Sequence, residues 1–138
     1  MNTPNLWAVL ASTVASIIIG SIWYGPMLFG KKYMQAVGMD SWTPEKREKM
    51  RKAAGMSYFG QTIASAIMFY VLSGIIVWYD KTSASGGAAI AFWMWLGFIF
   101  PTKLGDLLWG GNKTIFWLSI GGSFITLLVG GAIIGVMN

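Results

Sequence analysis

The ionisable side chains that could do chemistry in an apolar environment are few in this chain. Lys103 and Asp106 stand three residues apart, so on a helix they share one face and can form an ion pair. The chain has no His and no Cys, which removes most zinc, haem, iron–sulfur and thiol chemistry together with Ser-His-Asp catalysis. One acid and one base complete no catalytic constellation. We therefore expect no enzyme, no catalytic residue, no metal site and no cofactor.

Several other residues fall near the same depth as this pair if the apolar segments cross a membrane. Pro26 and Pro101 lack an amide hydrogen, so each leaves a backbone carbonyl that needs a new partner. A place that offers several desolvated polar groups could hold a ligand or ordered water. The residues of this predicted inner-leaflet cavity are Trp23, Tyr24, Pro26, Gln61, Pro101, Lys103 and Asp106. The alternative is an ordinary helix-end ion pair beside aromatic rings that only anchor the interface.

The composition excludes a soluble globular domain. Of 138 residues, 55% are hydrophobic and 11% are charged, whereas about a quarter of the residues of a soluble domain are charged. Crossing the hydrocarbon core takes a helix of about 20 apolar residues. The segments that can cross are residues 6–25, 56–79, 84–106 and 114–137. We predict an all-α membrane protein in which residues 1–138 form one domain, a four-transmembrane-helix bundle made of two hairpins.

The basic residues divide unequally among the segments that connect these spans. Seven Lys and Arg residues lie between the first two spans, and Lys103 and Lys113 lie near the end of the third span and after it, whereas Lys81 stands alone between the second and third. The positive-inside rule then places the basic side in the cytoplasm and both termini outside. We expect a multi-pass membrane protein. Its net charge of +5 suits anionic lipid headgroups, and we expect no nucleic-acid partner.

The polar segment between the first two spans contains a signal for a helix start. In Thr43-Pro44-Glu45, a hydroxyl can cap the helix, Pro fits the first helical position and an acid suits the first turn. We predict that the second helix begins near Pro44 and that residues 44–55 extend into the cytoplasm as a basic stalk. The stalk would set the orientation of the protein. Binding of a partner or a lipid is the alternative.

Small residues recur where they would let helix backbones approach each other in lipid. In the first span they are Ser12, Ser16 and Gly20, at intervals of four. We predict that this face packs against the small and polar face of the second span. The residues of that second face are Ala53, Ser57, Gly60, Gln61, Ala64 and Ser65. The alternative is that these polar side chains line a hydrated path.

The fourth span has small residues on two faces. Gly122 and Gly130 lie together on one face, while Gly131 and Gly135 lie on another. Two such faces predict two sets of helix contacts, one within the protomer and one between protomers. We therefore expect a homo-oligomer.

The end of the first span carries a recognisable block. Its residues are Gly20, then Trp23-Tyr24-Gly25-Pro26, then Phe29-Gly30-Lys31, and Asn5, Gly97 and Phe98 add to the pattern. In this block the chain resembles a family of small bacterial four-helix membrane proteins catalogued as a domain of unknown function. The likeness covers nearly the whole chain. The resemblance implies the same four-helix fold and a place in a bacterial inner membrane. It also draws attention to Trp23 and Tyr24, but the family brings no activity.

These patterns favour a non-enzymatic, homo-oligomeric structural or interaction protein that binds membrane lipids or other membrane proteins. The alternative is a small channel or carrier that moves a small solute through the inner-leaflet cavity. No Asp, Glu, Lys or Arg lies in the middle of a span, where proton-coupled carriers and voltage sensors keep such charges. The side chains that distinguish the two, by being dry or hydrated, are Ser12, Ser16, Ser57, Gln61 and Ser65.

Overall fold

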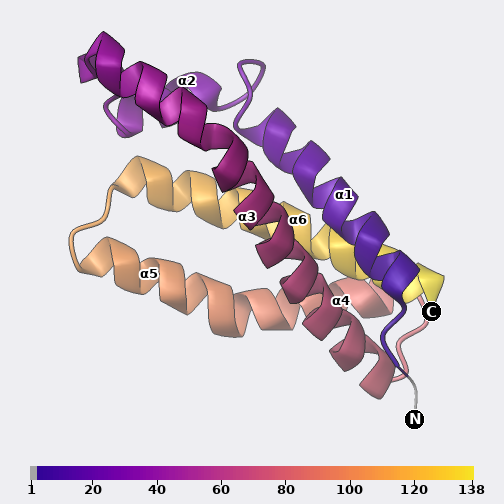
Figure 1. The fold of residues 1–138 in the computed structure, drawn as a ribbon. Helices are drawn as coiled ribbons and strands as arrows, with labels where there is room; N and C mark the ends of the chain where they lie inside the picture. Colours follow the sequence, from indigo (N-terminus) through magenta and orange to yellow (C-terminus); the bar gives the residue numbers. More distant parts are fainter. Residues whose placement is uncertain (1–2) are drawn as a thin grey trace.

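A computed structural model describes residues 3–138, so the first two residues of the predicted domain lie outside it. Its elements are α1 (Leu6–Trp23), α2 (Gly30–Ala36), a short 3₁₀ turn η1 (Met39–Ser41), α3 (Pro44–Trp78), α4 (Ala84–Met94), a π-helical turn η2 (Trp95–Ile99), α5 (Phe100–Leu108) and α6 (Lys113–Met137). The described chain is all-helical, without a strand (Figure 1). Four helices are long and apolar enough to cross a membrane: α1, α3, the continuous helix from Ala84 to Leu108, and α6. The predicted fold class is confirmed.

The third span is one helix with an irregular turn in its middle. Pro101 cannot donate a backbone hydrogen bond, and its ring crowds the preceding turn of an ordinary α-helix. The backbone widens before it, and the Phe100 N–H donates to the carbonyl of Trp95, five residues back. Because the helix continues past the proline to Leu108, the third span reaches the length that its strictly apolar part lacks.

The start of α1 and the end of α6 lie together at one end of the bundle, and the basic segments lie at the other (Figure 1). The Asn5 side-chain amide donates to the Met137 carbonyl at 2.9 Å, which joins the start of α1 to the end of α6. At the opposite end, the Asn112 amide donates to the Ala36 carbonyl at 3.4 Å and joins α2 to the start of α6. The segments that carry nine of the ten basic residues therefore lie at the end opposite the contact between Asn5 and Met137, although the first half of α3 stands apart from the others.

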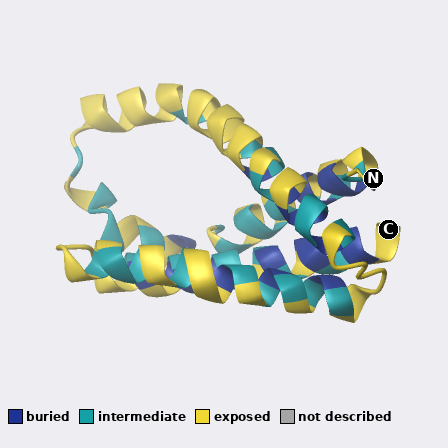
Figure 2. Cartoon of the chain, turned by 90° about the horizontal axis from the view of Figure 1, so that it is seen from below, coloured by how far each residue is buried: buried dark blue, intermediate teal, exposed yellow. Residues whose placement is uncertain are grey.

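The core lies where α1, α3, α4 and α6 cross near the chain ends (Figure 2). Its fully buried members are Ala8, Phe69, Ile76, Ala91 and Ile134. A group of aromatic rings extends the core between α6 and the third span. Within this group, the buried indole of Trp95 donates to the Ser123 hydroxyl at 3.0 Å.

One glycine face of α6 receives aromatic side chains from other helices. A Cβ added to Gly122 would lie 3.1 Å from Cδ1 of Trp23, and one added to Gly130 would overlap the ring of Phe69 in α3. Both glycines are buried. This face is therefore a contact within the protomer, tight at Gly122 and with room for nothing larger than glycine under the Phe69 ring at Gly130.

The second glycine face of α6 is also buried within the chain, against α4. A Cβ added to Gly131 would lie 2.6 Å from the carbonyl oxygen of Gly87, and one added to Gly135 would overlap the carbonyl of Ser83. The prediction that one of the two α6 faces would remain for a second protomer is therefore wrong. The small residues of α4 allow the two backbones to approach closely and occupy that face.

The small face of α1 packs against α6 rather than against the small face of α3. The buried Ser12 hydroxyl donates to the Gly130 carbonyl of α6 at 3.1 Å. The Ser16 hydroxyl instead donates to the Thr13 carbonyl of its own helix at 2.6 Å, and a Cβ added to Gly20 would meet nothing within 4 Å. The prediction that this face packs against the small face of the second span is therefore wrong, because most of that second face lies on an uncovered part of α3.

The helix α3 begins at Pro44, as the sequence predicts. The Thr43 hydroxyl caps it by accepting from the Lys46 N–H at 3.2 Å. From Pro44 to Ala64 the helix has no buried residue, and burial begins at Ser65. Figure 2 shows this exposed first half bowing away from the other helices. Part of the predicted second span, and not only the polar stalk, is therefore uncovered.

Candidate functional site

The predicted inner-leaflet cavity does not form as one site. Trp23 and Lys103 are half-buried, whereas Tyr24, Pro26, Gln61, Pro101 and Asp106 are exposed. No hydrogen bond or ion pair in the described chain joins any two of these seven side chains. The sequence predicts a similar depth in the membrane for these residues, but they lie on segments of the chain that diverge at this end of the bundle.

The expected ion pair between Lys103 and Asp106 is likewise absent. Within residues 3–138, the single ion pair shorter than 4 Å joins Arg51 to Glu48 on α3, at 2.9 Å. Lys103 is half-buried and Asp106 is exposed. An exposed ion pair gains at most about 1 kcal/mol, so little favours one fixed geometry for the two side chains.

The structure instead forms a cavity of about 650 Å³ between α2 and the start of α6, at the basic end. Its lining residues are Trp23, Phe29, Lys32, Gln35, Ala36, Thr114, Trp117 and Leu118. Of the predicted cavity residues, Trp23 is the one that lines it. The name basic-end cavity is used below for this site.

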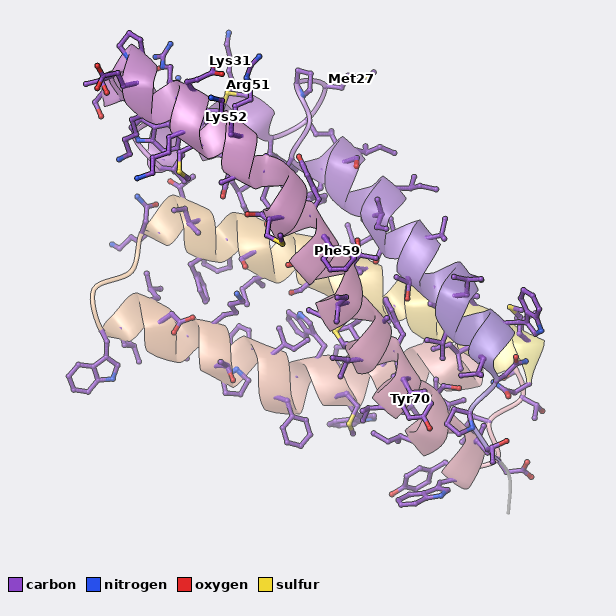
Figure 3. The ribbon with its side chains drawn as sticks, in the orientation of Figure 1. Met27, Lys31, Arg51, Lys52, Phe59 and Tyr70 are labelled. Atoms are coloured by element: carbon purple, nitrogen blue, oxygen red, sulfur yellow. The ribbon has the colours of Figure 1, made fainter. Side chains whose placement is uncertain are left out.

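A tight turn between α1 and α2 builds one wall of the basic-end cavity. The Phe29 N–H donates to the Trp23 carbonyl at 3.1 Å, and the Gly30 N–H donates to the Gly25 carbonyl at 2.9 Å. A Cβ on Gly30 would lie 2.7 Å from the Gly25 oxygen, so the turn requires glycine at this position. The turn brings the rings of Trp23 and Phe29 together with their centroids 4.8 Å apart. Figure 3 shows Met27 at its tip.

Trp23 fastens this turn to α6. Its indole N–H donates to the Leu118 carbonyl at 2.9 Å, and the ring lies on Gly121 and Gly122. The Tyr24 ring does not join this contact and instead makes an edge-to-face contact with Tyr33 of α2, with the ring centroids 5.0 Å apart. The two adjacent aromatic residues therefore have different roles: Trp23 joins the helices and lines the cavity, whereas Tyr24 supports α2.

The start of α6 forms the opposite wall. The Asn112 side chain caps this helix by accepting from the N–H groups of Thr114 and Ile115, at 2.8 and 3.2 Å. The cap fixes the first turn of α6, which carries Thr114 and Trp117 into the cavity wall. The positive end of the helix dipole lies at the same place.

The lining of the basic-end cavity carries a positive charge and no negative charge. Lys32 is the one charged residue among the eight, and no carboxylate is present. Gln35, Thr114 and Trp117 add an amide, a hydroxyl and an indole N–H, all of which can donate hydrogen bonds. The remaining lining is aromatic or aliphatic. Such a site suits an anion attached to an apolar group.

Reasoning from the sequence missed most of this site, namely Phe29, Lys32, Gln35, Ala36, Thr114, Trp117 and Leu118. The predicted topology already placed the segment after the first span and the start of the fourth span on the same side of the membrane. The missing information was that α2 folds back against α6. The side-chain amide of Asn112, which reaches the end of α2, is part of that contact.

The comparisons with known proteins give one match. A family model described as "Protein of unknown function (DUF1761)" matches residues 7–135. The matched range includes the tight turn, the whole lining of the basic-end cavity and nearly all of the four long helices. No curated protein matches the chain, and no solved structure matches it.

Proposed function

The chain belongs to the DUF1761 family of proteins of unknown function, and we propose that it is a non-enzymatic interaction protein of a bacterial inner membrane. In this proposal its basic end faces the cytoplasm and binds anionic lipids, both termini lie outside, and copies of the chain associate with each other. The observation that carries the proposal is the separation of charge along the bundle.

The charges at the two ends of the bundle differ strongly. Nine basic and four acidic residues lie in the segments at the basic end, whereas Lys81 and Asp80 balance each other at the end near the termini. Figure 3 shows Lys31 of α2 on the same end as Arg51 and Lys52 of α3. Anionic lipids attract basic residues near the membrane surface by about 1 kcal/mol each. The basic end therefore favours an anionic leaflet, which supports the orientation and the class of lipid.

Lipid binding is tested by the thermal midpoint of the delipidated protein in detergent. We expect phosphatidylglycerol to raise the midpoint by several degrees, because a ligand at 100 times its Kd stabilises the folded state by about 2.7 kcal/mol. Phosphatidylcholine should raise it much less, and 1 M salt should reduce the difference by screening the charges. Equal stabilisation by the two lipids at low salt would contradict the proposal.

Self-association is proposed through the first half of α3, since α6 offers no free glycine face. Gln61 lies in the uncovered part of α3, within the apolar segment, and its hydrogen bond in the described chain is a long one to Ser65 at 3.4 Å. A side-chain amide has both donors and an acceptor, so two copies related by a two-fold axis can bond to each other through it. Gly60 beside it leaves room for a second helix, because a Cβ there would meet nothing within 4 Å.

We expect Gln61→Leu to raise the dissociation constant of the oligomer by about tenfold, since hydrogen bonds between membrane helices contribute about 0.6–1.7 kcal/mol each. Energy transfer between labelled protomers in vesicles, followed as lipid is added, measures this constant. The matched control is Thr62→Val, because the Thr62 hydroxyl already donates to the Tyr58 carbonyl of its own helix at 2.8 Å. Wild-type protein that stays monomeric at every ratio of protein to lipid would refute self-association.

The side chains that would mark a channel or carrier take part in helix packing or bond to their own helix. Ser12 bonds to Gly130, Ser16 to Thr13, Ser57 to Ala53 and Gln61 to Ser65. Ser12 and Ser65 are buried, whereas Ser57 and Gln61 are exposed on α3. Ser12 lies against α6, whereas Ser57 and Gln61 lie on the uncovered part of α3, and no particular observation favours the channel alternative. We therefore do not propose it.

A further inference from the structure

We infer that the basic-end cavity binds the headgroup of one anionic phospholipid, with the phosphate beside Lys32 and the glycerol against the aromatic wall. This inference rests on the proposed function, because it assigns a specific site to the lipid binding proposed for the whole basic end. The cavity, at about 650 Å³, lies within the range of about 300–1,000 Å³ that is usual for small-molecule sites.

The phosphate position follows from the polar part of the lining. Lys32 supplies the charge, and the Gln35 amide and the Thr114 hydroxyl, which line the same cavity, can donate hydrogen bonds. The indole of Trp117 is 66% exposed and makes no hydrogen bond in the described chain, so its N–H can also donate. The Trp23 indole is not available, because it already bonds to the Leu118 carbonyl. These groups match a phosphate, which accepts hydrogen bonds and carries negative charge.

The apolar part of the lining indicates a lipid rather than a free phosphate. The rings of Trp23 and Phe29 and the side chains of Ala36 and Leu118 form this part. It lies where α1 ends and α6 begins, which is the depth at which a membrane-spanning helix meets the headgroups. A free phosphate would leave these apolar groups without a partner, whereas the glycerol and the first acyl carbons of a lipid would cover them.

The charge of the lining selects an anionic headgroup over a zwitterionic one. The ammonium group of a zwitterionic lipid would meet Lys32, with Lys31 and Lys113 adjacent to the lining in sequence and no carboxylate in the wall. Like charges at close range oppose binding, and a headgroup without a cation avoids this cost. We therefore assign the site to a phosphatidylglycerol-like lipid.

The test measures phosphatidylglycerol and phosphatidylcholine retained by the detergent-solubilised full chain, using native mass spectrometry. We expect Lys32→Glu to lower the bound phosphatidylglycerol by about tenfold or more, because it replaces an attraction by a repulsion. The matched control is Lys81→Glu, which makes the same change of charge at an exposed position outside the basic end and should change retention less than about twofold. Ala36→Phe fills the cavity without changing the charge and should lower retention as Lys32→Glu does.

The other possible outcomes show whether the proposed function fails or only the assignment of the lipid to this cavity. If the wild type shows no preference for phosphatidylglycerol, the proposed function fails together with this site. If the preference persists in both Lys32→Glu and Ala36→Phe but is lost when Lys49→Glu reverses a charge on the stalk, the stalk binds the lipid and only the cavity assignment is overturned. Competition by millimolar inorganic phosphate would overturn the lipid as occupant. The thermal midpoint of each variant shows that it remains folded, and either cavity variant alone decides the outcome if the other unfolds.

Discussion

Gly87→Ala is expected to destabilise the protein by about 3 kcal/mol, at the upper end of what overpacking usually costs. A Cβ at Gly87 would overlap the Gly131 carbonyl and lie 3.1 Å from the Cα of Gly135. These are backbone atoms of α6, so no side chain can rotate away, and α4 and α6 must separate. The thermal midpoint in detergent should fall by about 10 °C.

The matched control for this prediction is Gly105→Ala in α5. A Cβ there would meet nothing within 4 Å, and alanine is favoured over glycine within a helix by about 0.5–1 kcal/mol. The control should therefore keep or slightly raise the thermal midpoint. If Gly87→Ala were as well tolerated as Gly105→Ala, the close packing of α4 on α6 would be refuted. By the same reasoning, Gly131→Leu and Gly135→Leu should unfold the protomer rather than dissociate an oligomer.

Trp23→Ala is expected to cost about 3–5 kcal/mol, as is usual when a large aromatic side chain is removed from a packed site. The indole covers Gly121 and Gly122, packs at a tilt against the Phe29 ring and donates to the Leu118 carbonyl. Its removal therefore detaches the turn between α1 and α2 from α6. The thermal midpoint measures the loss.

Two variants test the origin of this effect. Trp23→Phe keeps a ring over the glycines but loses the hydrogen bond, and we expect it to cost about 1–3 kcal/mol, less than alanine. Trp109→Ala removes a tryptophan that is 93% exposed and should change the midpoint little. If Trp23→Ala and Trp109→Ala lowered the thermal midpoint equally, Trp23 would only anchor the membrane interface. This is the alternative that the sequence left open.

Features that depend on neighbouring residues were predictable from the sequence. The apolar segments identified four helices, and the Thr43-Pro44-Glu45 signal located the start of α3 at Pro44. The Asn112 cap of α6 belongs to the same class. Each is decided within one or two helical turns, by hydrogen bonds and by transfer of side chains into lipid, so the local sequence contains the necessary information.

The small residues showed that helices would approach closely, but they did not show which helices. Ser83, Gly87 and Ala91 recur every four residues and were a signal for the α4 face that covers Gly131 and Gly135. The sequence offered α1, α3 and α6 faces of the same kind. The choice among them depends on how whole helices fit together, and only the tertiary structure decides it.

The candidate site was the least predictable part. The sequence by itself determined that the chain forms four helices long and apolar enough to cross a membrane, and that nine of its ten basic residues lie toward one end. The tertiary structure decided that Lys103 and Asp106 do not pair, that α3 leaves the bundle, and that α2 folds against α6 to form the basic-end cavity. The physical reason is one of range: hydropathy and capping act between neighbours in the chain, whereas a cavity between Lys32 and Thr114 exists only after distant segments have packed.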